Sequence, residues 1–306
     1  MPLVSVIMPT YRRDDTLRRA IKSVVGQTYK NIELIVVNDN GVGGDYSPRV
    51  GEVVRSFAAH DDRVRLLEPS EHKNGAFARN RGVEASSGEL IAFLDDDDWW
   101  EPIKIERQVA AFASLSDDWG VVSCRVKRYR GDELISVLPK HPDGYVYKDI
   151  MLLASDFPTG TLMVTRPLFE EIGGFDEGLM RHQDLQLLMR LTYRKKLLQL
   201  DEPLHCCDVS DGQNRLGPEA LSEAKKALFD SVSDVYGSLR PSERHAVAAA
   251  QRAEVGRMRI KNGETLRGIA DILGLLTAPE ALAKTVEKTF LRAHGNREAR
   301  KVVDAS

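Results

Sequence analysis

The 306-residue chain lacks the features that mark secreted, membrane-spanning or nucleic-acid-binding proteins. Its three cysteines are too few for a disulfide framework or a four-ligand zinc site, and two of them, Cys206 and Cys207, are adjacent. It has no run of about 18 apolar residues that could span a bilayer, and its N-terminus lacks a basic flank and cleavage site. Lys and Arg number 43 against 46 Asp and Glu, so no basic field attracts nucleic acid. We therefore expect a cytoplasmic protein that binds no nucleic acid.

What is present is an ordinary globular composition, with 42% hydrophobic, 29% charged and 7% aromatic residues. A chain this apolar can bury enough surface to offset the entropy lost on ordering, which excludes disorder as its main state. The length suits one large domain with an appendage, or two smaller domains.

The first hundred residues alternate short apolar runs with segments of helical period. We predict strands at 4–8, 32–37, 64–67 and 90–94, and helices at 17–25, 50–59, 76–85 and 102–112. This alternation is typical of parallel βαβ units with helices on both faces of the sheet. Ligands of such sheets bind beyond the carboxyl ends of the strands.

The second half of the chain is mixed and then wholly helical. A hairpin is expected over 121–138, strands at 161–164 and 197–200, and helices at 147–154, 167–172 and 184–193. Beyond about residue 215 four helices are expected, at 218–236, 241–262, 264–276 and 279–294. We therefore predict an α/β domain over 1–210 and a C-terminal helical region over 211–306.

Polar residues follow the predicted strands, at 9–11, 38–41, 74–82 and 95–98. The last of these is a run of four aspartates, whose like charges cannot all ionise cheaply side by side. A bound Mg²⁺ or Mn²⁺ would offset this repulsion, because both ions prefer oxygen ligands. The alternative is a solvated acidic turn that caps the next helix.

In this order along the chain, the motifs at 9–11, 38–41, 74–82, 93–100, 173–177 and 183–191 resemble those of family 2 inverting glycosyltransferases. The resemblance covers roughly residues 3–205. It implies the GT-A fold, a Rossmann-like and mostly parallel sheet, with a nucleotide-sugar half at 1–100 and an acceptor half at 101–210. It also implies a nucleotide-sugar donor, usually UDP-linked, and Mn²⁺ or Mg²⁺ as cofactor.

The resemblance assigns roles position by position. Asp97 is the first choice for the metal, although the register within four successive aspartates stays open, and His205 is either a metal or diphosphate ligand or a packed histidine. The expected donor-binding residues are Pro9, Thr10, Tyr11, Asp39, Asn74, Arg79, Asp95, Asp96 and Arg215.

An inverting transfer needs one carboxylate to take the proton of the acceptor hydroxyl, in parallel with inverting glycosidases. Asp184 holds the position of the family's base, at a helix start that favours a carboxylate. Gln183 and Gln186 stand where the family usually has acidic residues, and a plain helix-capping role is the alternative for Asp184. Gln183, His182 and Trp100 are expected on the acceptor side, with core packing as the alternative for Trp100.

Three other functions are weighed. A sugar nucleotidyltransferase would need a Gly-rich loop after the first strand, where this chain has residues 9–13 without glycine. A catalytically silent nucleotide-sugar-binding protein is suggested by Gln183 and Gln186. A phosphatase with an aspartate nucleophile is excluded, because its acidic pair would follow the first strand and not the fourth. There is also no Gly-x-x-x-x-Gly-Lys loop for nucleotide hydrolysis. We favour transfer to a hydroxyl of a bacterial-type surface glycan or lipid-linked glycan.

The C-terminal helices carry a local positive charge. Residues 251–306 hold 11 Lys and Arg against 7 Asp and Glu. The basic amphipathic segments fit either the inner face of an anionic membrane or packing on the α/β domain or on a second copy. We favour packing, because core-facing stripes are the commoner cause of this pattern.

Overall fold

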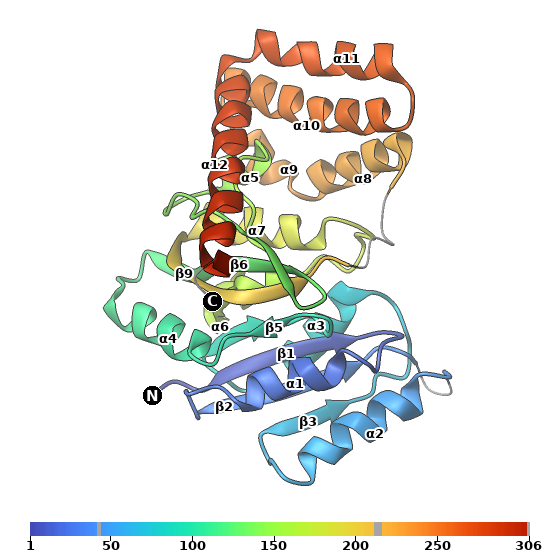
Figure 1. Ribbon diagram of the computed structural model, residues 1–306, viewed down its shortest axis with the longest axis vertical. Coiled ribbons are helices and arrows are strands. Elements are labelled where there is room, and N and C mark those ends of the chain that lie inside the picture. Colours follow the sequence, from blue (N-terminus) through green and yellow to red (C-terminus); the bar gives the residue numbers. More distant parts are fainter. Residues whose placement is uncertain (42–43, 211–215, 305–306) are drawn as a thin grey trace.

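The computed structural model describes residues 1–41, 44–210 and 216–304. Within these residues nine strands form one sheet in the order β3-β2-β1-β4-β8-β6-β9-β5, and β7 pairs with β6 outside this path. Helices cover both faces, and the C-terminal helices form a layered group at one end of the molecule (Figure 1). This is the α/β arrangement followed by helices that the sequence predicts.

The first four strands are parallel neighbours and form the predicted βαβ series. They are β1 (Val4–Thr10), β2 (Ile32–Asn38), β3 (Val64–Leu67) and β4 (Leu90–Phe93), connected in part by α1 (Leu17–Val25), α2 (Ser47–Ala58) and α3 (Gly75–Glu84). Alternate side chains of β1 enter two cores: Val6 packs in the core that α1 and α2 share, and Ile7 in the core that includes α3. Gly82 lets α3 approach β1, because a Cβ there would collide with Ile7. The shared direction brings the carboxyl ends of these strands to one edge.

The second half of the sheet is mixed. β8 (Met163–Thr165) runs antiparallel to β4, and β6 (Trp119–Arg130) runs antiparallel to β8. β6 forms the predicted hairpin with β7 (Glu133–Val137) and also pairs in parallel with β9 (Lys196–Asp208). β9 continues well past the predicted end of its strand, since register shifts opposite Arg125 carry the ladder beyond Pro203. β5 (Trp99–Trp100), which pairs with β9, was not predicted because two residues carry no periodicity.

The helices of this half lie close to their predicted ranges. They are α4 (Lys104–Ser114), α5 (Tyr147–Met151), α6 (Arg166–Glu171) and α7 (Gln183–Arg194). The buried face of α7, which includes Leu187 and Leu188, belongs to the larger hydrophobic core. That burial fixes the helix whose first turn carries Asp184.

The C-terminal region is helical, as predicted, but one of the four expected helices, 218–236, is divided in two, and another, 279–294, continues to residue 304. It contains α8 (Pro218–Ser231), α9 (Ser233–Gly237), α10 (Pro241–Lys261), α11 (Thr265–Leu273) and α12 (Pro279–Asp304). Leu228, Val232 and Ala246 are buried in the same core as α7, which supports the packing alternative for these helices. The predicted boundary at residue 210, between the α/β domain and the helical region, stays a prediction, because residues on both sides of it share this core. Among the helices described, none combines the length and apolar character needed to cross a membrane.

Candidate active site

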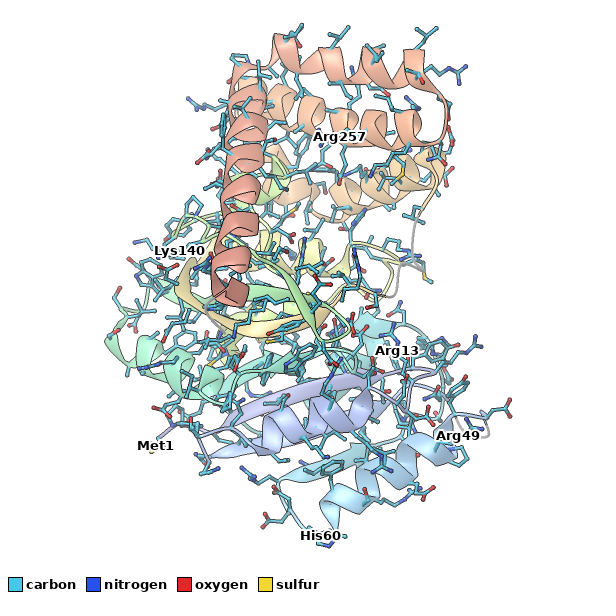
Figure 2. The ribbon with its side chains drawn as sticks, in the orientation of Figure 1. Met1, Arg13, Arg49, His60, Lys140 and Arg257 are labelled. Atoms are coloured by element: carbon cyan, nitrogen blue, oxygen red, sulfur yellow. The ribbon has the colours of Figure 1, made fainter. Side chains whose placement is uncertain are left out.

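A pocket of about 430 Å³ opens at the carboxyl edge of the parallel strands. In Figure 2 this edge is marked by Arg13, on the opposite side of the sheet from Met1. The pocket is lined by all but one of the expected donor residues and by the first choice for the metal, namely Pro9, Thr10, Tyr11, Asp39, Asn74, Arg79, Asp95, Asp96 and Asp97. Arg215 lies outside the described residues. Four strand-end segments separated in sequence thus share one site.

One side of the pocket presents a planar aromatic surface beside a buried hydrogen-bond acceptor, a carboxylate oxygen of Asp39. The rings of Tyr11 and His72 are stacked, 4.0 Å apart and within 6° of parallel. His72 Nδ1 lies 2.9 Å from Oδ2 of Asp39, whose other oxygen is buried with no hydrogen-bond partner among the described residues. Burial raises the pKa of Asp39, and the nearby His72 opposes this. An unmatched acceptor beside an aromatic face suits a base or ribose that donates an N–H or O–H.

His72 was missed by the sequence analysis. It lies between β3 and α3, in a polar segment without periodicity or a recognisable motif. Lys73, which also lines the pocket, was missed for the same reason. Only their position opposite the end of β1 brings them to the site.

Asn74 fixes the start of α3 and therefore the direction of Arg79. Its side chain accepts a hydrogen bond from the backbone N–H of Phe77 at 3.0 Å, as an N-cap does. Its amide donates to the carbonyl of Glu177 at 2.9 Å, and Asn80 donates to the carbonyl of Phe175 at the same distance. The first turns of α3 are thereby tied to the segment that precedes α7.

The aspartate run after β4 is largely buried and only partly neutralised. Arg79 pairs with Asp95, and Arg13 contacts both Asp96 and Asp97. Burial is the main cause that raises the pKa of Asp96 to about 7 and that of Asp97 to about 6. Neighbouring carboxylates raise both pKa values further, and Arg13 lowers them. These two carboxylates are therefore short of positive charge.

The donor atoms present fit a divalent cation that is shared with a ligand. Asp96 is 6% exposed, and its Oδ2 is buried without a hydrogen-bond partner among the described residues. Within residues 1–41, 44–210 and 216–304, no three His, Cys, Asp or Glu side chains are grouped as metal ligands. Mg²⁺ commonly uses one or two carboxylates and takes its other ligands from water and substrate phosphates. Asp97 and Asp96 match that pattern.

His205 and Trp100 lie behind the acidic run rather than in the pocket lining. His205 is fully buried, with Nε2 3.1 Å from Oδ2 of Asp98, and a Cβ on Gly160 would collide with its ring. A role for His205 as a metal or diphosphate ligand stays a prediction. Trp100 is 2% exposed and donates from Nε1 to the carbonyl of Gly160 at 2.8 Å. This burial favours the packing alternative for Trp100 over contact with an acceptor sugar.

The start of α7 borders the pocket on its other side. A Cβ on Gly75, which lines the pocket, would lie 3.5 Å from Oε1 of Gln183 and 2.8 Å from Nη1 of Arg79. Asp184 follows in the first turn, and its side chain reaches solvent. Desolvation by the surrounding protein raises the pKa of Asp184. The backbone N–H of Leu185 and the charges of His182 and Arg79 lower it in part.

His182 precedes α7 in a left-handed conformation, with φ 60° and ψ 26°. Its side chain is half-buried, not exposed as a loop histidine would be. Burial and the charge of Lys225 lower its pKa, so the C-terminal helix α8 contributes to the surroundings of this turn. Gln186, one of the two departures from the family pattern, is buried.

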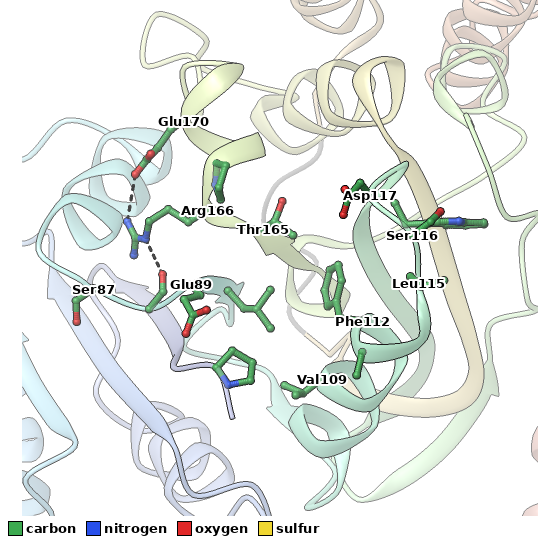
Figure 3. Close-up of a pocket in the computed structure, with 16 residues that line it drawn as sticks. Ser87, Glu89, Val109, Phe112, Leu115, Ser116, Asp117, Thr165, Arg166 and Glu170 are labelled. Carbon is green, nitrogen blue, oxygen red and sulfur yellow. Dashed lines mark hydrogen bonds and ion pairs between the residues drawn. The ribbon is translucent and has the colours of Figure 1, made fainter.

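A larger pocket, of about 630 Å³, lies at the opposite edge of the sheet, beside the starts of β4 and β6 (Figure 3). Its lining is mostly apolar and includes Val109, Phe112 and Leu115. Arg166 donates to the carbonyl of Gly88 at 2.6 Å and pairs with Glu170. The charge of Arg166 is thus paired locally, and this pocket shares no lining residue with the acidic pocket.

The fold is similar to those of solved glycosyltransferases. The structure of S. aureus TarS 1–349 in complex with UDP-GlcNAc superposes with a TM-score of 0.64 at 17% identity, covering 94% of this chain and 89% of that chain. Mannosyltransferase PcManGT from Pyrobaculum calidifontis, in complex with GDP-Man and Mn²⁺, has a TM-score of 0.54 at 20% identity and covers 97% and 80%. The likeness confirms the expected GT-A fold with C-terminal helices.

A family model described as Glycosyl transferase family 2 matches residues 5–173, more than half of the chain. The chain belongs to glycosyl transferase family 2. Glycosyltransferase GlyA of Streptococcus pneumoniae serotype 4 is 37% identical over 294 residues, which cover 88% of this chain and 39% of GlyA. Amylovoran biosynthesis glycosyltransferase AmsB of Erwinia amylovora is 28% identical over 192 residues, 61% of this chain and 62% of AmsB. The chain spans less than two thirds of the length of these relatives.

Proposed function

We propose that this protein is a metal-dependent inverting glycosyltransferase that moves a sugar from a UDP-linked donor to a hydroxyl of a glycan or lipid-linked glycan. The observation that carries the proposal is the carboxyl-edge pocket. It combines the stacked rings of Tyr11 and His72 with a buried oxygen of Asp39 that has no hydrogen-bond partner among the described residues. It also holds two neighbouring carboxylates whose negative charge is only partly neutralised. Complexes of TarS with UDP-GlcNAc and of PcManGT with GDP-Man and Mn²⁺ support a nucleotide-sugar donor for this fold.

On the donor side, Tyr11 and His72 provide the surface for the base, and Asp39 accepts a hydrogen bond from the base or ribose. Arg79 and Lys73 supply positive charge for the diphosphate. Asp97 and Asp96 would hold the divalent cation, with Asp95 facing the ribose or a cation-bound water. When bound, that cation stabilises the charge on the departing diphosphate.

On the acceptor side, Asp184 takes the proton of the acceptor hydroxyl. The hydroxyl oxygen bonds to the anomeric carbon while the bond from that carbon to the diphosphate oxygen breaks. The new bond forms on the face opposite the leaving group, so the configuration inverts. The raised pKa of Asp184 brings this carboxylate closer to the proton affinity that a general base needs.

Two partner predictions concern one exposed surface. Leu266, Leu273 and Leu276 of α11 and the turn after it are 85%, 54% and 68% exposed. Contact with an anionic membrane surface or with a second copy of the chain would use these side chains. Flotation with anionic vesicles and sedimentation velocity, each repeated with Leu273→Ser, distinguish the two.

The decisive experiment screens nucleotide sugars for donor hydrolysis and transfer, with and without EDTA. The proposal expects one donor class to be consumed only with Mn²⁺ or Mg²⁺ present. Consumption of every donor at the same rate in EDTA would contradict the metal requirement. Pyrophosphate release from a sugar phosphate and a nucleoside triphosphate would instead identify a nucleotidyltransferase.

A catalytically silent binding protein is the second candidate, because Gln183 and Gln186 replace carboxylates beside Asp184. It predicts that UDP-sugar binds with Mn²⁺ but is neither transferred nor hydrolysed. Restoring Gln183→Glu and Gln186→Asp together would then be needed before any turnover appears.

A further inference from the structure

Arg13 occupies the centre of the carboxylate pair. Its Nη1 atom lies 3.3 Å from Oδ1 of Asp96 and also contacts Oδ2 of Asp97. The residue lies in the loop after β1, and the hydroxyl of Thr10, the last residue of that strand, donates a hydrogen bond to the backbone carbonyl of Arg13 at 3.3 Å. The guanidinium is thus anchored by its backbone and held against the two carboxylates that would bind the cation.

The other aspartates of the run have separate partners. Arg79 pairs with Asp95, and His205 contacts Asp98. Among the described residues, Arg13 is therefore the cation that forms ion pairs with Asp96 and Asp97. A divalent ion bound by the same oxygens would lie within a few ångströms of the guanidinium, where two positive charges repel strongly.

A second hollow lies next to the first and can receive the displaced side chain. It has a volume of about 490 Å³ and shares Tyr11, Arg13 and Asp97 with the donor pocket. Its lining also includes Asp15 and Asp208, whose carboxylates offer an alternative partner for a guanidinium. The side chain of Arg13 is 37% exposed, so it lies at the surface and not in the hydrophobic core.

We propose that Arg13 is a built-in counter-ion, which holds Asp96 and Asp97 in place without donor and is displaced when the cation and the nucleotide diphosphate bind together. The proposal rests on the proposed function, because it concerns the same cation site. Free cation must compete with a tethered positive charge, whereas the cation–diphosphate complex offers the released guanidinium a phosphate partner. Cation and nucleotide therefore strengthen each other's binding, by the same factor in either order.

The test measures Mn²⁺ binding by the loss of the free-ion electron paramagnetic resonance signal, with and without UDP. In Arg13→Met the affinity for Mn²⁺ alone should rise by about tenfold, because the competing charge is gone. The factor by which UDP tightens Mn²⁺ binding should shrink correspondingly. Arg13→Lys keeps a positive charge and should stay near the wild type in Mn²⁺ affinity.

The matched control is Arg18→Met, which removes the same charge from an exposed position on α1. It should leave Mn²⁺ affinity within about twofold of the wild type, as expected for a screened surface charge. Circular dichroism and thermal unfolding establish that each variant is folded. Arg13→Gln is the second neutral variant, for use if Arg13→Met does not fold.

Mn²⁺ binding to folded Arg13→Met or Arg13→Gln that is no tighter than to the wild type overturns the inference. So does a complete absence of Mn²⁺ binding in all variants, which would also remove the metal from the proposed function. Tighter Mn²⁺ binding in the neutral variants without sugar transfer by any donor supports the counter-ion and contradicts the proposed activity.

Discussion

The pockets at the two edges of the same sheet differ in how well their polar side chains are paired. The amino edge carries the larger pocket, about 630 Å³, yet its lining is mostly apolar and Arg166 contacts Gly88, Ser86 and Glu170. The carboxyl edge carries the smaller pocket, about 430 Å³, where Asp39 and Asp96 each have a buried oxygen with no hydrogen-bond partner in the part of the chain that the structure describes. Because an unmatched buried charge costs free energy that a ligand can recover, we expect the smaller pocket to be the one that binds substrate.

The largest expected effect falls at the carboxyl edge. Asp184→Asn should lower kcat by about 10²–10⁴, because the acceptor hydroxyl loses its proton acceptor, and should leave UDP affinity unchanged. Transfer assays and calorimetric titration of UDP measure the two quantities. Asp234→Asn, an exposed position on α9, is the control. A kcat equal to that of the wild type would show that Asp184 is not the base.

Asp97→Asn should lower turnover by about 10²–10³, through weaker stabilisation of charge on the leaving diphosphate. Unlike Asp184→Asn, it should also weaken Mn²⁺-dependent binding of UDP. The comparison variant is Asp117→Asn in the apolar pocket, which makes the same chemical change at the other edge. Equal activity of the two variants would contradict the proposal that the carboxyl edge, and not the amino edge, takes part in the reaction.

The aromatic wall should contribute to donor affinity alone. His72→Ala should weaken UDP binding by about fivefold to tenfold, because both the stack with Tyr11 and the contact with Asp39 are lost. His72→Phe restores the ring without the Nδ1 contact, so it separates the two contributions in calorimetric titrations. An effect confined to kcat would show that this wall does not hold the base.

The acidic edge should also make stability depend on pH. The folded-state pKa of Asp96 is about 7 and that of Asp97 about 6, both above the ordinary aspartate value. The folded state therefore holds these protons longer than the unfolded state, and the free energy of unfolding falls as pH rises from about 4 to 7. In EDTA, Asp96→Asn should raise it by about 1–3 kcal/mol at pH 8. Near pH 4 the difference should vanish; an equal difference at both values contradicts the raised pKa.

The smallest effect on activity is expected at the amino edge. Arg166→Met should cost about 1–3 kcal/mol of stability, because it leaves the carbonyl of Gly88 without its donor. Its kcat/KM should equal that of the wild type. Denaturant unfolding and steady-state kinetics test this, and a large loss of kcat/KM would give the apolar pocket a part in the reaction.

Much of the parallel half could be predicted, because each strand and helix there has its own local period. Strands β1 to β4 lie where the apolar runs are, and the polar residues that follow them do meet. β5 and the far half of β9 could not be predicted, since Trp99–Trp100 forms a strand only by pairing with β9. Register shifts likewise extend β9 past Pro203 without a local signal.

The sequence by itself determined the α/β class, the helical C-terminus and the strand ends that would carry chemistry, since periodicity and parallel connection are local properties. Only the tertiary structure decided that Arg13 and His72 enter the pocket, that Trp100 and His205 pack behind it, and that α8 to α12 share the core of α7. These are contacts between segments far apart in the chain. They depend on which buried charges and apolar faces find partners in three dimensions, which no local pattern encodes.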